Sequence, residues 1–194
     1  MLLGVAPTVV TMAGVVIVTT ASFVLMSTRS VSLTLMILIV GFLADAFDGP
    51  LARLKGTASA YGAWLDTFCD RLNEVIFGIA ITMVYIMHFT SVEQQFVGLL
   101  ALGLGFLVSF SKASAEEKGI HPNWDDRWFL GYPGRLVFLL GGLGGTLVLP
   151  YSPETVMSFT LLFLFLFNFC VLVSRIRRIR QYAPAAHPRL GPRK

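Results

Sequence analysis

Six separate runs of apolar residues dominate this chain of 194 residues. A helix needs about 20 largely apolar residues to cross a bilayer core of about 30 Å. The runs are Val9–Met26, Val31–Ala44, Val75–Phe89, Phe96–Phe110, Leu136–Leu149 and Val156–Val173. Hydrophobic residues make up 55% of the chain and charged residues 13%, which is about half the charged share of a soluble domain. A soluble domain of this size could not cover that much apolar surface, so we predict an all-α, polytopic membrane protein with six transmembrane helices.

The second, third and fourth runs are short for a membrane span, and each continues on one side into a charged segment that still has a helical pattern. The second run continues from Asp45 towards Leu54, and the third extends backwards from Glu74 to about Gly62. We expect these helices to project beyond the bilayer or to line a polar cavity at its edge.

The basic residues indicate how the chain is oriented in the membrane. The turns Ser27–Ser30, Thr90–Glu93 and Pro150–Glu154 share one side, and of the fifteen Lys and Arg only Arg29 falls there. Because basic residues are enriched on the cytoplasmic side, both termini and the polar cavity are expected to face the cytoplasm. The first run lacks the basic flank and cleavage site of a signal peptide. We expect one membrane domain over residues 1–182 and a flexible basic tail over 183–194.

Four aspartates form the most informative cluster in the sequence. Asp45 and Asp48 are three residues apart, and Asp66 and Asp70 are four apart, so each pair shares one face of a helix. The first pair ends the second run and the other opens the third. The two pairs are therefore expected at the same membrane depth on neighbouring antiparallel helices, where four carboxylates can converge.

Such a cluster favours a divalent metal site. Alternatively, the aspartates are solvated helix ends or pair with Arg53, Lys55 and Arg71. Each carboxylate near the bilayer costs up to about 3 kcal/mol, and three cations do not neutralise four of them. Hard oxygen ligands on facing helices suit one or two Mg²⁺ or Mn²⁺ ions. The three histidines are isolated from one another, so a zinc site is not expected.

Glycine and arginine beside the aspartates point to a phosphate-bearing substrate. Gly49 and Gly62 lack a Cβ and allow close approach to the backbone, although each could equally serve helix packing. Arg53 supplies a forked donor for a phosphate oxygen. Metals, an arginine and a close-packed pocket suit the cleavage or transfer of a pyrophosphate, with one carboxylate acting as a base.

Two other functions use similar residues. An intramembrane prenyltransferase also places Mg²⁺ between helix-borne aspartates, but in two motifs far apart in the chain. A divalent-cation transporter would need polar residues through the full membrane depth. Here the mid-span amide is Asn168, which is expected to hydrogen-bond between helices, and Gly141–Gly145 is expected to pack helices closely.

The aspartate cassette resembles the signature of the CDP-alcohol phosphotransferase family. The pattern D-x2-D-G-x2-A-R-x8-G-x3-D-x3-D is matched at all eight fixed positions from Asp45 to Asp70. The resemblance implies transfer of a substituted phosphate from a CDP-alcohol lipid, CDP-diacylglycerol or an archaeal equivalent, to a hydroxyl acceptor, with release of CMP. By this resemblance Asp45, Asp48 and Asp66 hold the metal, and Asp70 lies at the metal site and is the general base.

The same resemblance assigns contacts to the cytidine diphosphate. Gly49, Arg53, Ser59 and Gly62 are the expected contacts in and near the cassette. The segment Pro7-Thr8-Val-Val-Thr11 resembles the family's Pro-x-x-x-Thr segment near the nucleotide. Thr8 and Thr11 could equally be a helix cap and an ordinary span residue.

The acceptor is indicated by a second stretch. Ser111–Gly119 resembles the K-A-x-A-E-x-x-G segment of phosphatidylinositol-phosphate synthases, which use inositol phosphate as acceptor. Lys112, Arg135 and Arg175 fall where that subgroup places basic residues that bind the acceptor phosphate. Each could instead be an interfacial residue whose charged end reaches water.

The resemblance to this subgroup is incomplete. Gly131-Tyr-Pro-Gly-Arg135 stands where a Glu-Arg-x-x-Arg run is expected, so one arginine is missing. Phe129-x-Gly131-x-Pro133 resembles phosphatidylserine synthases instead. Phosphatidylserine synthase and phosphatidylglycerol-phosphate synthase therefore stay open as alternatives. The expected partners are the CDP-alcohol lipid, a small polar or phosphorylated acceptor, membrane lipids and a second copy of the chain in a homodimer, with no nucleic acid.

Overall fold

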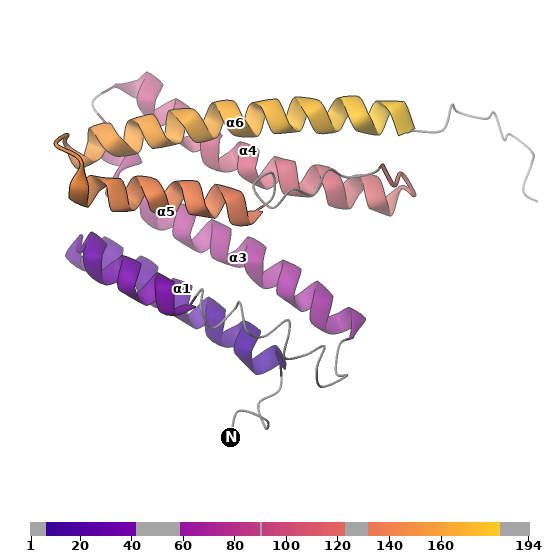
Figure 1. The fold of residues 1–194 in the computed structure, drawn as a ribbon, viewed down its shortest axis with the longest axis horizontal. Helices are drawn as coiled ribbons and strands as arrows, with labels where there is room; N and C mark the ends of the chain where they lie inside the picture. The colour runs from indigo at the N-terminus through magenta and orange to yellow at the C-terminus, as the bar shows by residue number, and fades with distance from the viewer. Residues whose placement is uncertain (1–6, 42–58, 90, 123–131, 183–194) are drawn as a thin grey trace, which may run out of the picture.

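The described part of the chain is all-helical and contains no strand. The computed structural model describes residues 7–41, 59–89, 91–122 and 132–182 (Figure 1). The helices are α1 (Pro7–Thr28), a helix whose described part is Val31–Gly41, α3 (Ala60–Val84), the 3₁₀ turn η2 (Ile86–His88), α4 (Val92–Glu117), α5 (Tyr132–Val148) and α6 (Pro153–Tyr182). Over its described residues, each of the six apolar runs thus lies largely in a helix.

The helix ends differ from the apolar runs at two informative places. The charged extension of the third run is confirmed, because α3 begins at Ala60, well before Val75. That run is predicted to stay helical to Phe89, but α3 ends at Val84 and tightens into η2, as helix ends often do. At the other end of the molecule, α6 continues through its arginine-rich segment to Tyr182.

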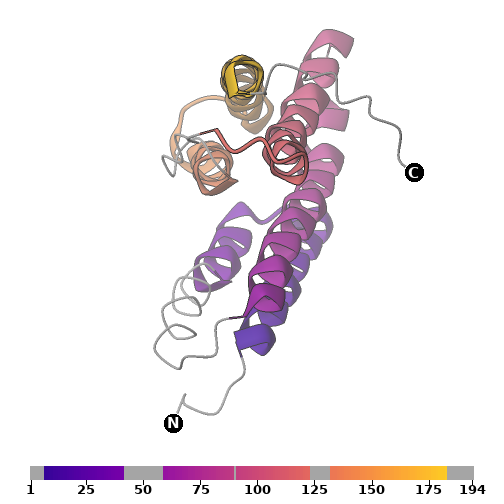
Figure 2. The same cartoon turned by 90° about the vertical axis from the view of Figure 1, so that its right-hand side faces the viewer.

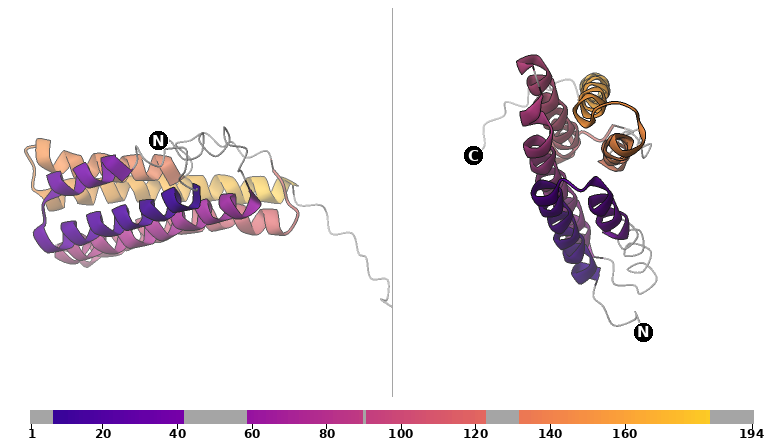
Figure 3. Two further views of the ribbon diagram at one scale, coloured as in Figure 1. Left: turned by 90° about the horizontal axis from the view of Figure 1, so that it is seen from below. Right: turned by 90° about the vertical axis from the view of Figure 1, so that its left-hand side faces the viewer.

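The helices lie roughly lengthwise beside one another in a flat bundle. α3 lies along α1, and α6 lies along both α4 and α5 (Figures 1 and 2). The left view in Figure 3, from below, shows the long helices side by side. α5 and α6 approach closely at Gly142, where an added Cβ would overlap with the Thr160 side chain. This contact confirms the packing role predicted for the glycine-rich segment.

The short turns between helices gather at one end of the bundle. Arg29 and His88, which follow α1 and α3, are joined by a hydrogen bond of 3.0 Å between Nη2 and Nε2. A pocket at the same end is lined both by the segment from His88 to Val97 and by the start of α6 from Ser152. The described residues of the three predicted turns thus lie at one end of the fold, and their common side of the membrane stays a prediction.

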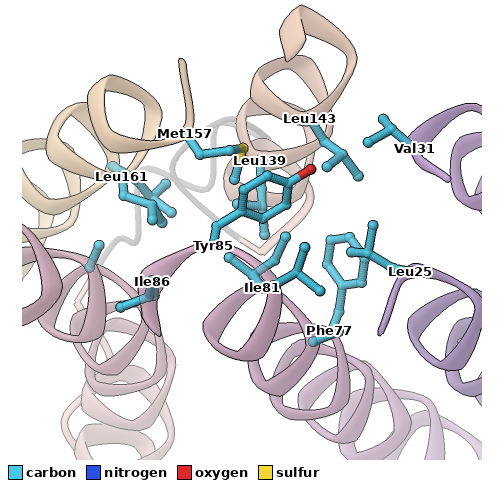
Figure 4. Close-up of a cluster of buried hydrophobic side chains, with 14 of the residues drawn as sticks. Leu25, Val31, Phe77, Ile81, Tyr85, Ile86, Leu139, Leu143, Met157 and Leu161 are labelled. Carbon is cyan, nitrogen blue, oxygen red and sulfur yellow. The ribbon is translucent and has the colours of Figure 1, made fainter. Parts of the chain in front are cut away.

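A buried apolar cluster closes the bundle near that end. It is built from Phe77 and Ile81 of α3 and Tyr85, which follows α3, together with leucines of α1 and α5 and side chains of α6 (Figure 4). Ile81 and Ile86 are fully buried. The rigid cluster fixes the helices relative to one another and so positions the polar groups at the opposite end.

The outer surface of the bundle is apolar, as a lipid-facing surface must be. Large hydrophobic side chains stand exposed on every long helix, for example Phe23 of α1 at 70% and Phe159 of α6 at 68%. Three helices, containing Val9–Thr28, Val92–Glu117 and Pro153–Tyr182, are long and apolar enough to cross a membrane. Soluble proteins rarely expose so continuous an apolar surface to water, so the molecule is a membrane protein.

Candidate active site

Asp66 and Asp70 lie on successive turns of α3, in the part that precedes its apolar run. Asp66 is exposed and Asp70 is half-buried. Since they are four residues apart on one continuous helix, their side chains share a face, as predicted. α3 therefore presents two carboxylates at the polar end of the bundle.

The start of α3 is fixed by its own cap. The Ser59 hydroxyl accepts a hydrogen bond of 3.0 Å from the backbone N–H of Gly62. A Cβ at Gly62 would lie 3.2 Å from that hydroxyl oxygen, so glycine fits the cap closely. Ser59 and Gly62, predicted as nucleotide contacts, therefore also set the first turn of the helix that carries the aspartates.

The pKa of the Cys69 thiol is sensitive to its burial and to the two neighbouring carboxylates. Cys69 is buried beside them on α3. Burial raises the pKa of this thiol, and the negative charges of Asp66 and Asp70 raise it further. The two carboxylates therefore contribute a negative electrostatic environment to this part of α3.

The donor set suits a hard divalent cation, although only half of the predicted ligands can be placed. Asp66 and Asp70 supply carboxylate oxygens, the ligands that Mg²⁺ and Mn²⁺ prefer. Asp45 and Asp48 lie outside the described residues, as do Gly49 and Arg53. Within the described ranges, no three His, Cys, Asp or Glu side chains are grouped to hold a metal.

The start of α1 lies at the same end of the molecule as Asp66. α1 and α3 pack side by side, and their last residues meet at the Arg29–His88 contact, so the two helices run parallel. Thr8 and Thr11, in the first turns of α1, therefore lie at the end where α3 begins. This placement is compatible with their predicted position near the nucleotide.

Two of the three predicted acceptor residues contact the same turn of α4. Arg135 of α5 donates from Nη2 to the Ser109 hydroxyl at 2.9 Å. Arg175 of α6 donates to the carbonyl oxygen of Val108. Lys112 lies one turn further along α4, three residues from Ser109 and hence on the same face. The fold thus brings cations from three helices around one segment of α4.

An ion-pair network that was not predicted lies beside these cations. Glu74 accepts from Arg135 Nη2 at 3.0 Å and from Arg71 Nη1 at 2.7 Å. Both arginines also donate to the Ser109 hydroxyl. Glu74 is four residues after Asp70, so the network lies one helical turn from the aspartates and on their face of α3.

Close packing around Gly105 makes this network possible. A Cβ at Gly105 would lie 3.1 Å from Glu74 Oε1 and 3.3 Å from Arg135 Nε. Asn168 lies on the other side and donates from Nδ2 to the Ala101 carbonyl at 2.9 Å, which confirms its predicted role between helices. These side chains line a cavity of about 30 Å³. Polar groups from four helices thus meet in the interior of the bundle.

Sequence reasoning missed Glu74 and Ser109 as members of the site. A signal was present, since Glu74 stands at the edge of the third apolar run while Ser109 and Arg135 stand at the edges of the fourth and fifth. A carboxylate and an arginine at the same edge of neighbouring spans are expected to pair.

The fold and the surface define an all-helical membrane protein with carboxylates and arginines gathered at one end. The profile of the CDP-alcohol phosphatidyltransferase family matches residues 4–175. The chain belongs to this family, and the resemblance seen in the aspartate cassette is confirmed.

Named relatives come from bacteria and archaea. The phosphatidylinositol phosphate synthase of Mycolicibacterium smegmatis is 29% identical over 150 residues, which cover 77% of this chain and 66% of that protein. The archaetidylinositol phosphate synthase of Pyrococcus horikoshii is 34% identical over 119 residues, which cover 60% of this chain and 58% of that protein. The match spans less than two thirds of the length of each relative.

Solved structures share the fold over nearly the whole chain. The phosphatidylinositol phosphate synthase of Mycobacterium tuberculosis with CDP-DAG bound has a TM-score of 0.80 and 22% identity, covering 95% of this chain and 91% of that one. The same enzyme in complex with manganese and citrate has a TM-score of 0.81 at 22% identity, covering 95% and 87%. The helical arrangement described above is therefore that of a known membrane fold.

Proposed function

We propose that the protein transfers a substituted phosphate from a CDP-alcohol lipid to a hydroxyl of inositol phosphate, releasing CMP, in phospholipid biosynthesis. The observation that carries the acceptor assignment is the approach of Arg135 and Arg175 to one turn of α4, beside Lys112. Inositol phosphate carries a phosphate that several basic side chains can hold. The names of the relatives support the same class of acceptor.

In this proposal Asp70 acts as the general base. It accepts the proton of the acceptor hydroxyl while that oxygen forms a bond to the phosphorus that bears the lipid alcohol. The bond from this phosphorus to the bridging oxygen breaks, and CMP leaves with that oxygen. Its position on α3, one turn from the network that contacts Arg135, suits a base that must lie between donor and acceptor.

Asp45, Asp48, Asp66 and Asp70 would hold one or two Mg²⁺ or Mn²⁺ ions. When bound, the metal supplies positive charge that neutralises the pyrophosphate and the departing CMP. Gly49, Arg53, Ser59 and Gly62, with Thr8 and Thr11, would bind the cytidine diphosphate.

The proposal includes the topology in the membrane. Six helices would cross the bilayer, with both termini and a polar cavity on the cytoplasmic side, so that the lipid donor enters laterally and the acceptor enters from water. Support comes from the gathering of the short turns at the other end of the bundle. A homodimer is part of this proposal, and the exposed phenylalanines of α6, such as Phe159, offer either an interface or a lipid-facing surface.

The test is CMP release by purified protein in detergent with CDP-diacylglycerol and Mg²⁺ or Mn²⁺. Inositol phosphate, inositol, serine and glycerol phosphate are offered separately as acceptors. We expect release that requires both metal and inositol phosphate. Release with serine or glycerol phosphate alone would instead identify one of the two alternative synthases. Failure to bind CDP in the presence of metal would contradict the assigned activity.

A further inference from the structure

We propose that Glu74 is a positioning residue for the acceptor site, which holds the Arg135 guanidinium where the acceptor phosphate binds. The inference rests on the proposed function, because that function assigns Arg135 to the acceptor. Glu74 itself would not touch the substrate. Its effect would pass through the arginine that it orients.

Two guanidinium nitrogens of Arg135 donate hydrogen bonds to the Glu74 carboxylate. Glu74 Oε1 accepts from Arg135 Nε at 3.2 Å and from Nη2 at 3.0 Å. Arg135 is 4% exposed, and a buried guanidinium is costly without a carboxylate that matches its fork. Glu74 therefore fixes both the charge balance and the orientation of this side chain.

Glu74 also contacts a second arginine, Arg71, so its carboxylate must balance two positive charges. Arg71 donates from Nη1 both to Glu74 Oε2 and to the Ser109 hydroxyl, which also accepts from Arg135. Because the two guanidinium groups share both acceptors, they are close neighbours and repel each other. Glu74 contacts both of them, and its carboxylate keeps the two positive charges together beside Ser109.

If Glu74 positions Arg135, replacing Glu74 should change the affinity for the acceptor in the opposite direction from a simple charge effect. Replacing Glu74 with glutamine removes one negative charge near the predicted phosphate site, so the net charge there becomes more positive. Attraction alone would then bind a phosphorylated acceptor more tightly. If Glu74 positions Arg135, the two arginines separate instead and the acceptor binds more weakly.

The experiment compares E74Q, E74D and E117Q with wild type, each as the full chain in detergent. E117Q is the matched control, because Glu117 is exposed at the end of α4 and undergoes the same charge change. We expect E74Q to raise the KM for inositol phosphate about tenfold or more, with the KM for CDP-diacylglycerol within about twofold of wild type. E74D should recover part of the loss, and E117Q should match wild type. An acceptor KM that is unchanged or lowered in E74Q would overturn the inference.

A double variant keeps the test decisive if E74Q does not fold. R71Q/E74Q removes one charge of each sign, so the network keeps its net charge and loses the repulsion. We expect this variant to fold and still to show a raised acceptor KM, because Arg135 has lost its forked partner. If its acceptor KM equals that of wild type, Glu74 only balances charge and the inference is wrong.

A binding measurement separates this inference from the proposed function. Inorganic phosphate is titrated against the thermal unfolding of each variant, and its half-effective concentration should rise about tenfold in E74Q. If wild type transfers to no phosphorylated acceptor but this shift is seen, the proposed function fails and the positioning role stands. If wild type uses inositol phosphate and neither readout changes in E74Q, the positioning role fails alone.

Discussion

Gly142 on α5 and Thr160 on α6 lie so close that one methyl group at Gly142 would overlap with the threonine side chain. The Thr160 hydroxyl is turned back onto its own helix and donates to the Val156 carbonyl at 2.8 Å. Without a hydrophobic drive between helices in lipid, such close approach supplies much of the association through van der Waals contact. The relationship therefore fixes α5, and with it Arg135, against α6.

The substitution G142A should destabilise the protein, because the new methyl group must push the two helices apart. Overpacking of this kind costs about 1–3 kcal/mol. G141A is the matched control on the same helix, since a Cβ there meets nothing within 4 Å. We expect thermal unfolding in detergent to show a lower midpoint for G142A and a midpoint near that of wild type for G141A. Equal midpoints for the two variants would contradict the packing described.

The substitution G105A should disturb the proposed acceptor site more than the fold. Its Cβ would press on Glu74 Oε1 and Arg135 Nε, so the pair must shift by a few tenths of an ångström. We expect the KM for inositol phosphate to rise severalfold, since small displacements of a binding group are costly. G103A, at an open position on the same helix, should leave that KM unchanged. A G105A variant with wild-type kinetics would show that the pair tolerates displacement.

Replacing Asn168 with alanine should weaken the contact between α6 and α4. The variant loses the 2.9 Å hydrogen bond to the Ala101 carbonyl from a side chain that is 1% exposed. Hydrogen bonds between membrane helices contribute about 0.5–2 kcal/mol, so the free energy of unfolding should fall by that amount. C170A, on the exposed face of α6, is the control. Denaturant titration in mixed micelles measures both variants, and a loss as large in C170A would rule out the hydrogen bond as the cause.

The sequence was sufficient for the parts of the fold that depend on hydrophobic patterning. The described residues of the six apolar runs are largely helical, and α3 extends into its charged segment as expected, because apolar length and helical spacing are local properties. The pairing of Asp66 with Asp70 on one face follows equally from their spacing. Asp45 and Asp48, the other half of the predicted metal site, lie outside the described residues, so their convergence stays a prediction.

The ion-pair network could not be derived from the sequence alone. Glu74 meets Arg135 across 61 positions of sequence, and this contact depends on how α3, α4 and α5 pack. The close approach requires Gly105, whose role appears only when the neighbouring side chains are in place. Sequence placed a basic residue at the start of α5 and assigned it to the acceptor. The positions of Glu74 and Arg135 at the edges of their apolar runs indicate that they could pair, but which helices pack together had to come from the structure.

The substitution D70N provides the sharpest test of the proposed chemistry. D70N keeps the size of the side chain but removes the group that would accept the proton of the acceptor hydroxyl. We expect CMP release to fall by about 10²–10⁴-fold, the range that general base catalysis contributes. CDP binding in the presence of Mn²⁺ should persist, because the other predicted metal ligands and nucleotide contacts are intact. This binding is measured as the rise in thermal unfolding temperature on adding CDP. E117Q, an exposed change of the same kind, should retain full activity. If D70N turns over at a rate near that of wild type, another group takes the proton and Asp70 is not the base.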